Sequence, residues 1–363
     1  MRFLYIISLL LLFAAKAQAA GVAVIAPKDG DEARFGRQMS EGVKIAVEVI
    51  NESGGLLGEK LELLDMDDAC SESASQGNLQ RLRLGADSGV NLVVGPYCID
   101  EPLQNLSKDT HAVWIIPQPL TNSRYNYDRV GLFKIGGRVS EQAKTVLEVY
   151  KDRWIDKNMA VVYDAADDAA YETAAEVQNI FAANELANRI TLYDMKSYDG
   201  KLKKLAKEIV RNNKVAYVLG KKSQIAEIAQ KLQEKDENIT LIIDEYKATD
   251  FFFKEMGNFA DGVYFLRVND QKSNANFTKD LVELRIKKRE PRGLGLIGYA
   301  AVMMWRDMVE EAESFEAGTI EKISTLKSWS LPWGKTKFQH GRALLTGGWN
   351  MYLMEDGEYT QVN

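Results

Sequence analysis

The chain is poor in the side chains on which many metal and hydrolytic sites depend. Its 363 residues include two histidines and two cysteines. The histidines, His111 and His340, are far apart, and each stands alone. A histidine metal site needs clustered imidazoles, and a serine or cysteine triad needs a histidine base. This scarcity disfavours both kinds of site, and we expect a protein that has no metal, no cofactor and no catalytic residue and is not an enzyme.

Long apolar runs are confined to the N-terminus. Arg2 precedes the apolar segment 3–15, and Ala17-Gln18-Ala19 is a small-x-small motif. This order is typical of a secretory signal peptide over residues 1–19. The segment is shorter than the ~20 residues of a membrane span, and no comparable run follows, so we expect a soluble, exported mature chain. A retained N-terminal anchor is the alternative.

An excess of basic charge is also lacking. Without Arg2 and Lys16, 44 lysines and arginines remain against 52 acidic residues, a net charge of −8. The acidic residues are spread along the chain and are not clustered in blocks, which favours solubility and gives no sign of a nucleic-acid partner. A mature chain of about 344 residues exceeds the usual size of one core, so two lobes are expected.

The two cysteines, Cys70 and Cys98, each follow a short apolar run and lie at predicted strand ends. In an oxidising compartment, an even cysteine count favours a disulfide over a metal or redox pair. Such a bond would stabilise the fold by ~3 to 4 kcal/mol in the chain-entropy model. Two free buried thiols are the alternative.

Apolar strands and amphipathic helices alternate along the chain, a pattern that predicts parallel sheets covered by helices on both faces. Such sheets bind ligands beyond the carboxyl ends of their strands. The helical stripes are typical of core packing, so we assign them no partner or membrane role. Strands are predicted at residues 22–26, 61–66, 90–94 and 112–116, and after Gly136-Gly137 at 159–163, 215–219, 239–243 and 262–266.

The C-terminal third is less regular. From Arg267 to about Pro291 the chain is polar and charged, and no element is predicted there. A long helix is predicted from about Leu294 into Glu313. Glycines around short apolar runs after Trp333 indicate returning strands.

Two enzyme-like motifs lack the context that their chemistry needs. Residues 293–298 match the dinucleotide fingerprint letter for letter, but the preceding segment is charged and contains Pro291, so no strand feeds it. Asp164, Asp167 and Asp168 follow a strand but lack the glycine and distal glutamate of a calcium loop. A secreted enzyme that uses this acidic cluster stays open as an alternative.

Several motifs together resemble a known family, the leucine/isoleucine/valine-binding proteins, which are type I periplasmic solute-binding proteins that serve ABC importers. The resemblance implies a fold of two Rossmann-like α/β lobes with parallel sheets, joined by three crossings. Family members carry a disulfide between two of these motifs, residues 66–70 and residues 94–98. The other motifs are Gly36 with the helix after it, Ile50-Asn51 followed by residues 54–58, residues 299–302, and the closing segment 338–359.

The resemblance places the crossings near Gly136-Gly137, near residues 266–269 and near residues 339–342. Lobe one would then comprise 20–136 and 267–339, and lobe two 137–266 and 340–363. It also implies a periplasmic monomer that closes on its ligand by a hinge motion and delivers it to an inner-membrane ABC permease. A sensor that passes its closure to a regulator or receptor is the alternative.

The resemblance further implies contacts with a zwitterionic ligand. Glu245 falls where the second-lobe acid of the family holds the ammonium group. Phe35 matches an aromatic residue that packs on the ligand, with a core role as the alternative. Tyr171, or Asp168 without an insertion, falls in the loop after Tyr163, where the second lobe often contributes an aromatic contact.

The carboxylate clamp of the family is altered in this chain. Ile99 stands where a serine is usual, and Pro117-Gln118-Pro119-Leu120-Thr121 replaces a segment of small residues with a threonine. Two or three hydrogen-bond donors directed at the ligand carboxylate must replace the water molecules that hydrate it in solution, yet Pro119 has no N–H to donate. Thr121 serves only if the loop shifts by one residue. We expect an amino acid, an amide or a related small polar ligand, and a cationic or neutral amide-like one is plausible.

Overall fold

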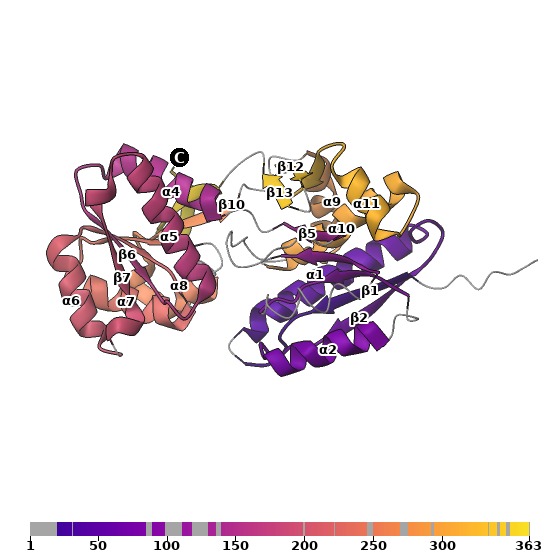
Figure 1. Cartoon of the computed structure of the whole chain (residues 1–363), viewed down its shortest axis with the longest axis horizontal. Helices are drawn as coiled ribbons and strands as arrows, with labels where there is room; N and C mark the ends of the chain where they lie inside the picture. The colour runs from indigo at the N-terminus through magenta and orange to yellow at the C-terminus, as the bar shows by residue number, and fades with distance from the viewer. Residues whose placement is uncertain are drawn as a thin grey trace, which may run out of the picture.

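The computed structural model describes two α/β lobes that lie end to end (Figure 1). Each lobe is built on one sheet, and we name the lobes by their sheets, the first lobe on the eight-stranded sheet and the second lobe on the seven-stranded sheet. The described residues are 20–30, 32–84, 89–98, 111–117, 130–135, 139–198, 200–220, 222–244, 250–268, 275–291, 294–332, 334–339, 342–345 and 349–362.

The eight-stranded sheet has the strand order β11-β12-β13-β5-β4-β3-β1-β2. The first five strands of the chain are parallel neighbours, and β13 joins them in parallel beside β5. β12 and β11 then extend this edge in antiparallel fashion. The strands are β1 (Ala20–Ile25), β2 (Leu61–Met66), β3 (Val90–Val94), β4 (Val113–Ile116), β5 (Leu132–Lys134), β11 (Trp329–Leu331), β12 (Gly334–Gln339) and β13 (Arg342–Leu345).

Helices cover both faces of this sheet, which is why its central strands are mostly apolar. Val22 and Val24 of β1 pack in the core cluster beneath helices α1 and α10. Ala23 and Ile25 point to the opposite face and pack in the cluster beneath α2. Alternate side chains of a strand point to opposite faces, so one buried strand feeds two cores. The helices of the first lobe are α1 (Ala33–Glu52), α2 (Glu72–Leu84), α9 (Ala275–Ile286), α10 (Leu294–Ala312) and α11 (Ala317–Ser324).

Helices α1 and α10 approach each other so closely that glycine is required at their crossing. A Cβ atom on Gly42 would lie 1.8 Å from the carbonyl oxygen of Gly295, and one on Gly298 would lie 2.4 Å from the carbonyl oxygen of Met39. The glycines of the 293–298 motif that the structure describes therefore serve helix packing. No strand precedes them, since α9 and a turn come before α10.

The seven-stranded sheet has the order β15-β14-β10-β9-β8-β6-β7. β6 to β10 are parallel, and β14 and β15 complete one edge in antiparallel fashion. The strands are β6 (Met159–Tyr163), β7 (Ile190–Asp194), β8 (Val215–Val218), β9 (Thr240–Ile243), β10 (Tyr264–Val268), β14 (Trp349–Glu355) and β15 (Glu358–Gln361).

The second lobe repeats the layering of the first. Val162 of β6 packs in the cluster beneath α6 and α7, and its neighbour Val161 packs in the cluster beneath α4 and α5. The helical stripes predicted in this region are thus core, as expected. The elements covering this sheet are α4 (Val139–Arg153), α5 (Asp168–Ala183), α6 (Leu202–Asn212), α7 (Lys222–Lys235) and α8 (Asp250–Met256), with the short 3-10 turns η2 (Ala187–Arg189), η3 (Met195–Tyr198) and η4 (Gly257–Ala260).

Each of the eight predicted strands is confirmed within two residues at either end, and so are the long helix near Leu294 and the returning strands of the tail. Helix α9 forms in the polar, charged segment between Arg267 and Pro291, where the sequence pattern did not single out an element. Among the α9 side chains that the structure describes, only Leu281 and Leu284 are buried, too few to give an apolar stripe. β5, β7 and α4 are further elements that the sequence pattern did not single out.

The strand pairing bears on the three expected crossings. The chain changes sheets after β5 and again after β10. The third crossing does not lie near Gln339, because β12 and β13 form a hairpin in which Gln339 pairs with Arg342. The chain leaves the eight-stranded sheet only between β13 and β14, so residues 342–345 belong with the first lobe's sheet.

The expected signal peptide, residues 1–19, lies outside the described residues and stays a prediction. Within the described ranges, no helix combines the length and the apolar character that a membrane crossing demands.

Candidate functional site

The segments that follow β1, β2 and β3 meet at one edge of the eight-stranded sheet. Ligands bind at this edge in open parallel α/β sheets, because the loops beyond the carboxyl ends of the strands form the crevice. Backbone bonds hold the three segments together: Ala26 donates its N–H to the carbonyl of Met66 (3.0 Å), and Tyr97 donates to the carbonyl of Ile25 (3.1 Å). The edge is therefore a fixed platform.

Gly95 allows the segment after β3 to cross close to β1. A Cβ atom at this position would lie 2.3 Å from the carbonyl oxygen of Ile25, and the backbone φ is +110°. Both the contact and the dihedral angle demand glycine. The turn carries Tyr97 and Cys98 over the end of β1.

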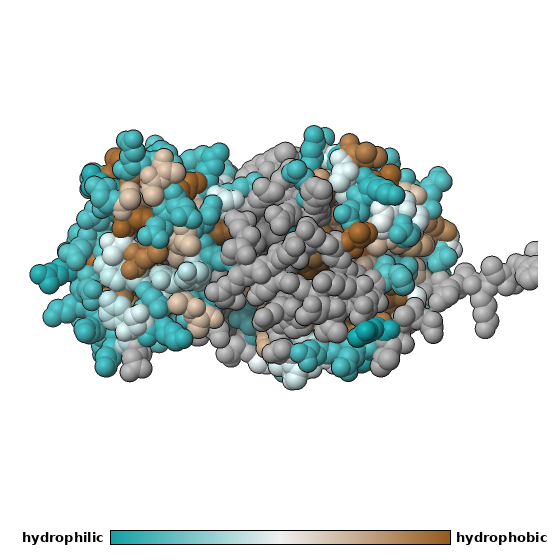
Figure 2. Space-filling model, viewed as in Figure 1, coloured by the Kyte–Doolittle hydropathy of each residue, from teal (hydrophilic) through white to brown (hydrophobic). Residues whose placement is uncertain are grey.

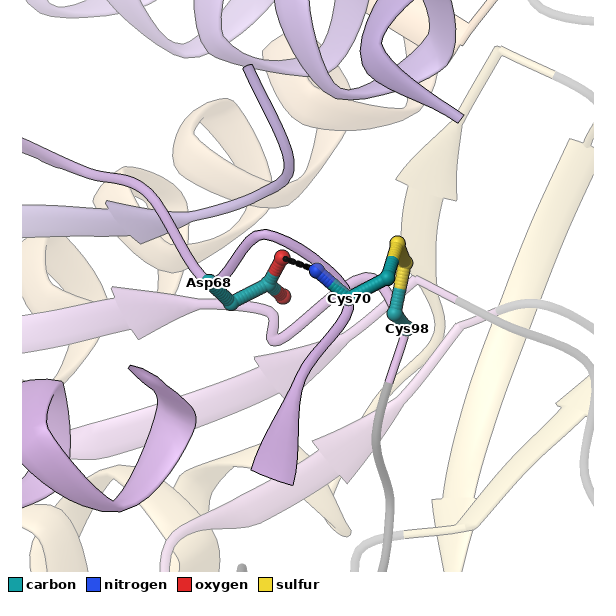
Figure 3. A group of neighbouring side chains, drawn as sticks. All are labelled: Asp68, Cys70 and Cys98. Carbon is teal, nitrogen blue, oxygen red and sulfur yellow. Dashed lines mark hydrogen bonds between the residues drawn. A yellow bond between two sulfur atoms is a disulfide. The ribbon is translucent and has the colours of Figure 1, made fainter. Parts of the chain in front are cut away.

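A disulfide joins Cys98 to Cys70 across this edge, which confirms the predicted pairing. The two Cα atoms are 5.0 Å apart, within the usual range for a disulfide. Cys70 is exposed and Cys98 is half-buried. The bond therefore staples the segment after β2 to the segment after β3 at the surface (Figure 3).

The carboxylate of Asp68 lies beside the disulfide and accepts a hydrogen bond from the backbone N–H of Cys70 at 3.0 Å (Figure 3). Asp68 is fully buried, and this burial raises its pKa above 3.8, although backbone N–H groups of Cys70, Cys98 and Tyr97 oppose the shift. Its oxygen and the two Sγ atoms lie within 4.8 Å of one another. A metal ion would need the two cysteines as thiolates, whereas here the two sulfurs are bonded to each other. In this state the disulfide, with Asp68 next to it, is therefore a structural cross-link.

Phe35, a predicted ligand contact, is buried in the first lobe with only 3% of its surface exposed. Its ring stacks on Tyr97, with ring centroids 6.4 Å apart and an interplanar angle of 24°. The Tyr97 hydroxyl donates to Glu32 at 3.2 Å. The structure thus gives Phe35 a core position next to the platform, and its contact with a ligand stays a prediction.

The acidic cluster of the second lobe is engaged in local structure. Asp164 is buried after β6, and its two carboxylate oxygens accept from the backbone N–H of Ala166 and the side-chain amide of Gln224, each at 2.9 Å. Asp167 caps α5 by accepting from the N–H of Ala170. These are the roles of turn and capping residues. They leave the alternative of a secreted enzyme without support from Asp164 and Asp167.

Tyr171 lies on the first turn of α5, not in the loop after Tyr163 as predicted. Asp167 ends that loop early, because its capping bond starts the helix at Asp168. Tyr171 keeps 44% of its surface exposed, and its ring lies 6.1 Å from that of Tyr163. The two rings form a tyrosine pair near the carboxyl end of β6. Asp168 is the first residue of α5.

Three predicted ligand residues, Glu245, Thr121 and Ile99, lie outside the described residues. The neighbour of Glu245 is described: Asp244 comes directly after β9 and is half-buried. β6, β8 and β9 are parallel, so Asp164, Gly220 and Asp244 all follow strands that end at the same edge. The role of Glu245, the next residue in the sequence, stays a prediction.

Sequence reasoning did not assign roles to three residues that the structure places at these edges. Tyr97 supports Phe35, Asp68 supports the disulfide, and Gln224 holds Asp164. Position within the motifs around Cys70 and Cys98 was the signal for the first two. Gln224 comes from a different helix, α7, and no local pattern links it to Asp164.

Comparisons with known proteins agree on one family. A family model described as periplasmic binding protein matches residues 20–357. The Leu/Ile/Val-binding protein BraC3 of Rhizobium johnstonii is 24% identical over 343 residues, which cover 93% of this chain and 92% of the relative.

Two solved structures share the fold. A leucine binding protein LivK from Thermotoga maritima superposes with a TM-score of 0.77 at 19% identity, covering 95% of this chain and 98% of that one. The branched-chain amino acid transporter substrate binding protein LivJ from Streptococcus pneumoniae, in complex with isoleucine, gives 0.76 at 17% identity and covers 95% and 99%. The chain therefore belongs to the periplasmic binding protein family, within the leucine/isoleucine/valine-binding group of type I solute-binding proteins.

Proposed function

We propose that this protein is the periplasmic substrate-binding component of an ABC importer, and that it captures an amino acid or a related small polar compound between its two lobes. The observation that carries the proposal is the family match over residues 20–357, and the division into two lobes, each built on its own sheet, supports it. The ligand bridges the lobes and stabilises the closed form by its higher affinity for that form. No chemistry on the ligand is needed.

The division of the chain supports a hinge. The chain passes between the sheets after β5, after β10 and after β13, so three segments connect the lobes. Hinge closure places the change in backbone dihedral angles in a few connecting residues and leaves each core intact. The separate core clusters of the two lobes are consistent with such rigid-body motion.

The proposed ammonium acceptor is Glu245, at the edge that follows β9. Thr121 and the backbone near Ile99 are proposed to face the ligand from the first lobe, with Phe35 behind them. On the second lobe, Tyr171 and Asp168 complete the set, and the exposed ring of Tyr171 offers an apolar face. An isoleucine at position 99 cannot donate a side-chain hydrogen bond. We therefore propose that the ligand depends less on a bound carboxylate than leucine or isoleucine does.

The ligand class is tested by a thermal-shift screen of the purified mature protein with amino acids, amides, polyamines and small aromatic acids. A ligand at ~100 times its dissociation constant adds ~2.7 kcal/mol to the free energy of unfolding, which is a readily measured shift. The bound compound is then recovered and analysed by mass spectrometry. A carrier returns it unchanged, whereas an altered compound would contradict the proposal.

Glu245→Ala is expected to weaken the binding of any ammonium-bearing hit by more than tenfold, or about 1.4 kcal/mol, because a desolvated ammonium loses its counter-charge. The control is Glu237→Ala, an exposed acid before the opposite, amino end of β9. Isothermal titration calorimetry gives both affinities. An unchanged affinity in Glu245→Ala would remove this residue from the site.

The transport role has its own measurement. Small-angle scattering should show a smaller radius of gyration when the ligand is added, since closure brings the lobes together. Liganded protein should also stimulate ATP hydrolysis by its permease in reconstituted vesicles. Closure without stimulation of any permease would favour the sensor alternative over the importer.

A further inference from the structure

Helix α6 carries a concentration of positive charge that is unusual for this acidic protein. Between positions 196 and 214 the sequence has seven lysines and arginines and two acids, in a chain with a net charge of −6. Lys203, Lys204, Lys207 and Arg211 are all exposed. At 100° per residue, these four positions fall within an arc of about 100° on one face of the helix. We call this face the cationic arc.

The opposite face of α6 belongs to the core. Leu205, Ala206 and Ile209 are fully buried and pack in the cluster beneath the seven-stranded sheet. No apolar face is left to insert into another molecule. The cationic arc therefore acts on its surroundings through charge alone.

Several other helices of this protein pair a lysine with an acid one turn away, whereas the cations of the arc on α6 are not paired in this way. Lys144 pairs with Glu148 on α4, Lys231 with Glu227 on α7, and Lys287 with Glu283 beside α9, each four residues apart. Among the described residues, none of the four cations of the arc has an acidic partner within ion-pair distance.

The one acid on α6, Glu208, faces Tyr198. Burial of the Tyr198 hydroxyl, together with the nearby Glu208 carboxylate, raises the pKa of Tyr198 to about 12. The spacings 203–207 and 207–211 instead put like charges on neighbouring turns, an arrangement that destabilises a helix. This repulsion lowers the stability of α6 and brings no benefit to the fold of the protein.

The composition of the arc favours a phosphate surface over a protein partner. Three of its four cations are lysines, which are depleted in protein interfaces, whereas arginine is enriched there. Within the described structure, neither a bound carboxylate nor an aromatic contact fixes their side chains. A mobile lysine ammonium is a point charge that suits many phosphate geometries.

The position of α6 leaves room for a large partner. Figure 1 places α6 at the end of the second lobe that points away from the first lobe, and hydrophilic residues dominate that end in Figure 2. A flat charged surface could approach there without meeting the first lobe or the platform around the disulfide.

We propose that the cationic arc of α6 docks the protein on an anionic phospholipid surface. Lipid headgroups supply the phosphate charges, and the interaction holds the second lobe at the membrane while the first lobe stays clear of it. This surface is separate from the proposed ligand site, so docking does not depend on the importer function.

The test is co-sedimentation of the full mature protein with phosphatidylcholine vesicles that contain about 30 mol % phosphatidylglycerol, at about 20 mM salt. The test variant is Lys203→Gln/Lys204→Gln/Lys207→Gln. The control, Lys60→Gln/Lys322→Gln/Lys337→Gln, removes the same charge from three exposed lysines of the first lobe. Circular dichroism and thermal melting verify that both variants fold.

Wild type and the control are expected to bind, and binding should disappear at about 500 mM salt because the charges are then screened. Each lysine contributes roughly a fivefold factor to the partition constant, so the test variant should bind on the order of 100-fold more weakly. Equal binding by the test variant, equal binding to pure phosphatidylcholine, or no binding by wild type would overturn the proposal. Wild-type capture by polyglutamate without vesicle binding would also overturn it, in favour of an acidic protein partner.

Discussion

The crossing of α1 and α10 gives a sharp prediction for the substitution Gly42→Ala. The new Cβ atom would lie 1.8 Å from the carbonyl oxygen of Gly295, and real Cβ atoms essentially never approach closer than 3.0 Å. The obstacle is backbone, so the two helices must separate by more than about 1 Å. Overpacking of this kind typically costs 1–3 kcal/mol and occasionally more, and we expect about 3 kcal/mol here because a rigid helix must move.

The expected loss corresponds to a fall in melting temperature of roughly 6–12 °C, at about 2–4 °C for each kcal/mol in a lobe of this size. Urea unfolding followed by tryptophan fluorescence measures it, because Trp305 is buried on α10 itself. The matched control is Gly77→Ala on α2, where an added Cβ would meet nothing within 4 Å. There the substitution should stabilise the protein by about 0.5–1 kcal/mol, since alanine is the better helix former.

The two alanines thus have predicted effects of opposite sign. A Gly42→Ala protein that unfolds at the same urea concentration as the wild type would show that the helices separate at no cost. That result would also remove the packing explanation for the glycines at 295 and 298.

The disulfide and the acid beside it lead to two further predictions. In the variant Cys70→Ser/Cys98→Ser, the first lobe should lose ~3 to 4 kcal/mol of its free energy of unfolding in urea, because the 28-residue separation is no longer closed. The unfolding transition of the second lobe should be unchanged. Thiol titration of the unfolded, unreduced wild type should find no free thiol. Burial raises the pKa of Asp68, so its favourable contribution is complete below pH 3.8 and is lost as the pH rises through the folded-state pKa. Asp68→Asn is uncharged throughout, so its stability relative to the wild type should increase from about pH 3 to about pH 7. A pH-independent difference in the free energy of unfolding would contradict this reasoning.

Most of the strands that the sequence predicted are buried on both faces of their sheet. Val113–Ile116 and Met159–Tyr163 form continuous apolar runs because helices cover both sides of the sheet. β7 lies at a sheet edge, where buried and exposed residues mix in Ile190–Asp194. β5 has three residues, fewer than a periodicity needs.

The functional residues were harder to predict, because a site gathers side chains that the sequence keeps apart. The cysteine pair was accessible, since two residues of the same rare type stand at the ends of predicted strands. Tyr171 was misplaced by a local event, the capping bond of Asp167 that begins α5. The bond from Gln224 to Asp164 spans 60 positions and is set by the packing of α7 against the sheet.

The close crossing of α1 and α10 also fixes an order of assembly for the growing chain. Gly42 and Gly295 meet although they are about 250 positions apart, and contacts of such long range form late. The parallel strands of the second lobe come from one continuous stretch, residues 159–268. As the chain emerges N-terminus first, that lobe has most of its sheet before the first lobe receives α10, which covers one face of the first sheet together with α1. A fragment that stops before α10 would leave part of that face open to water and prone to aggregation, however complete its strands.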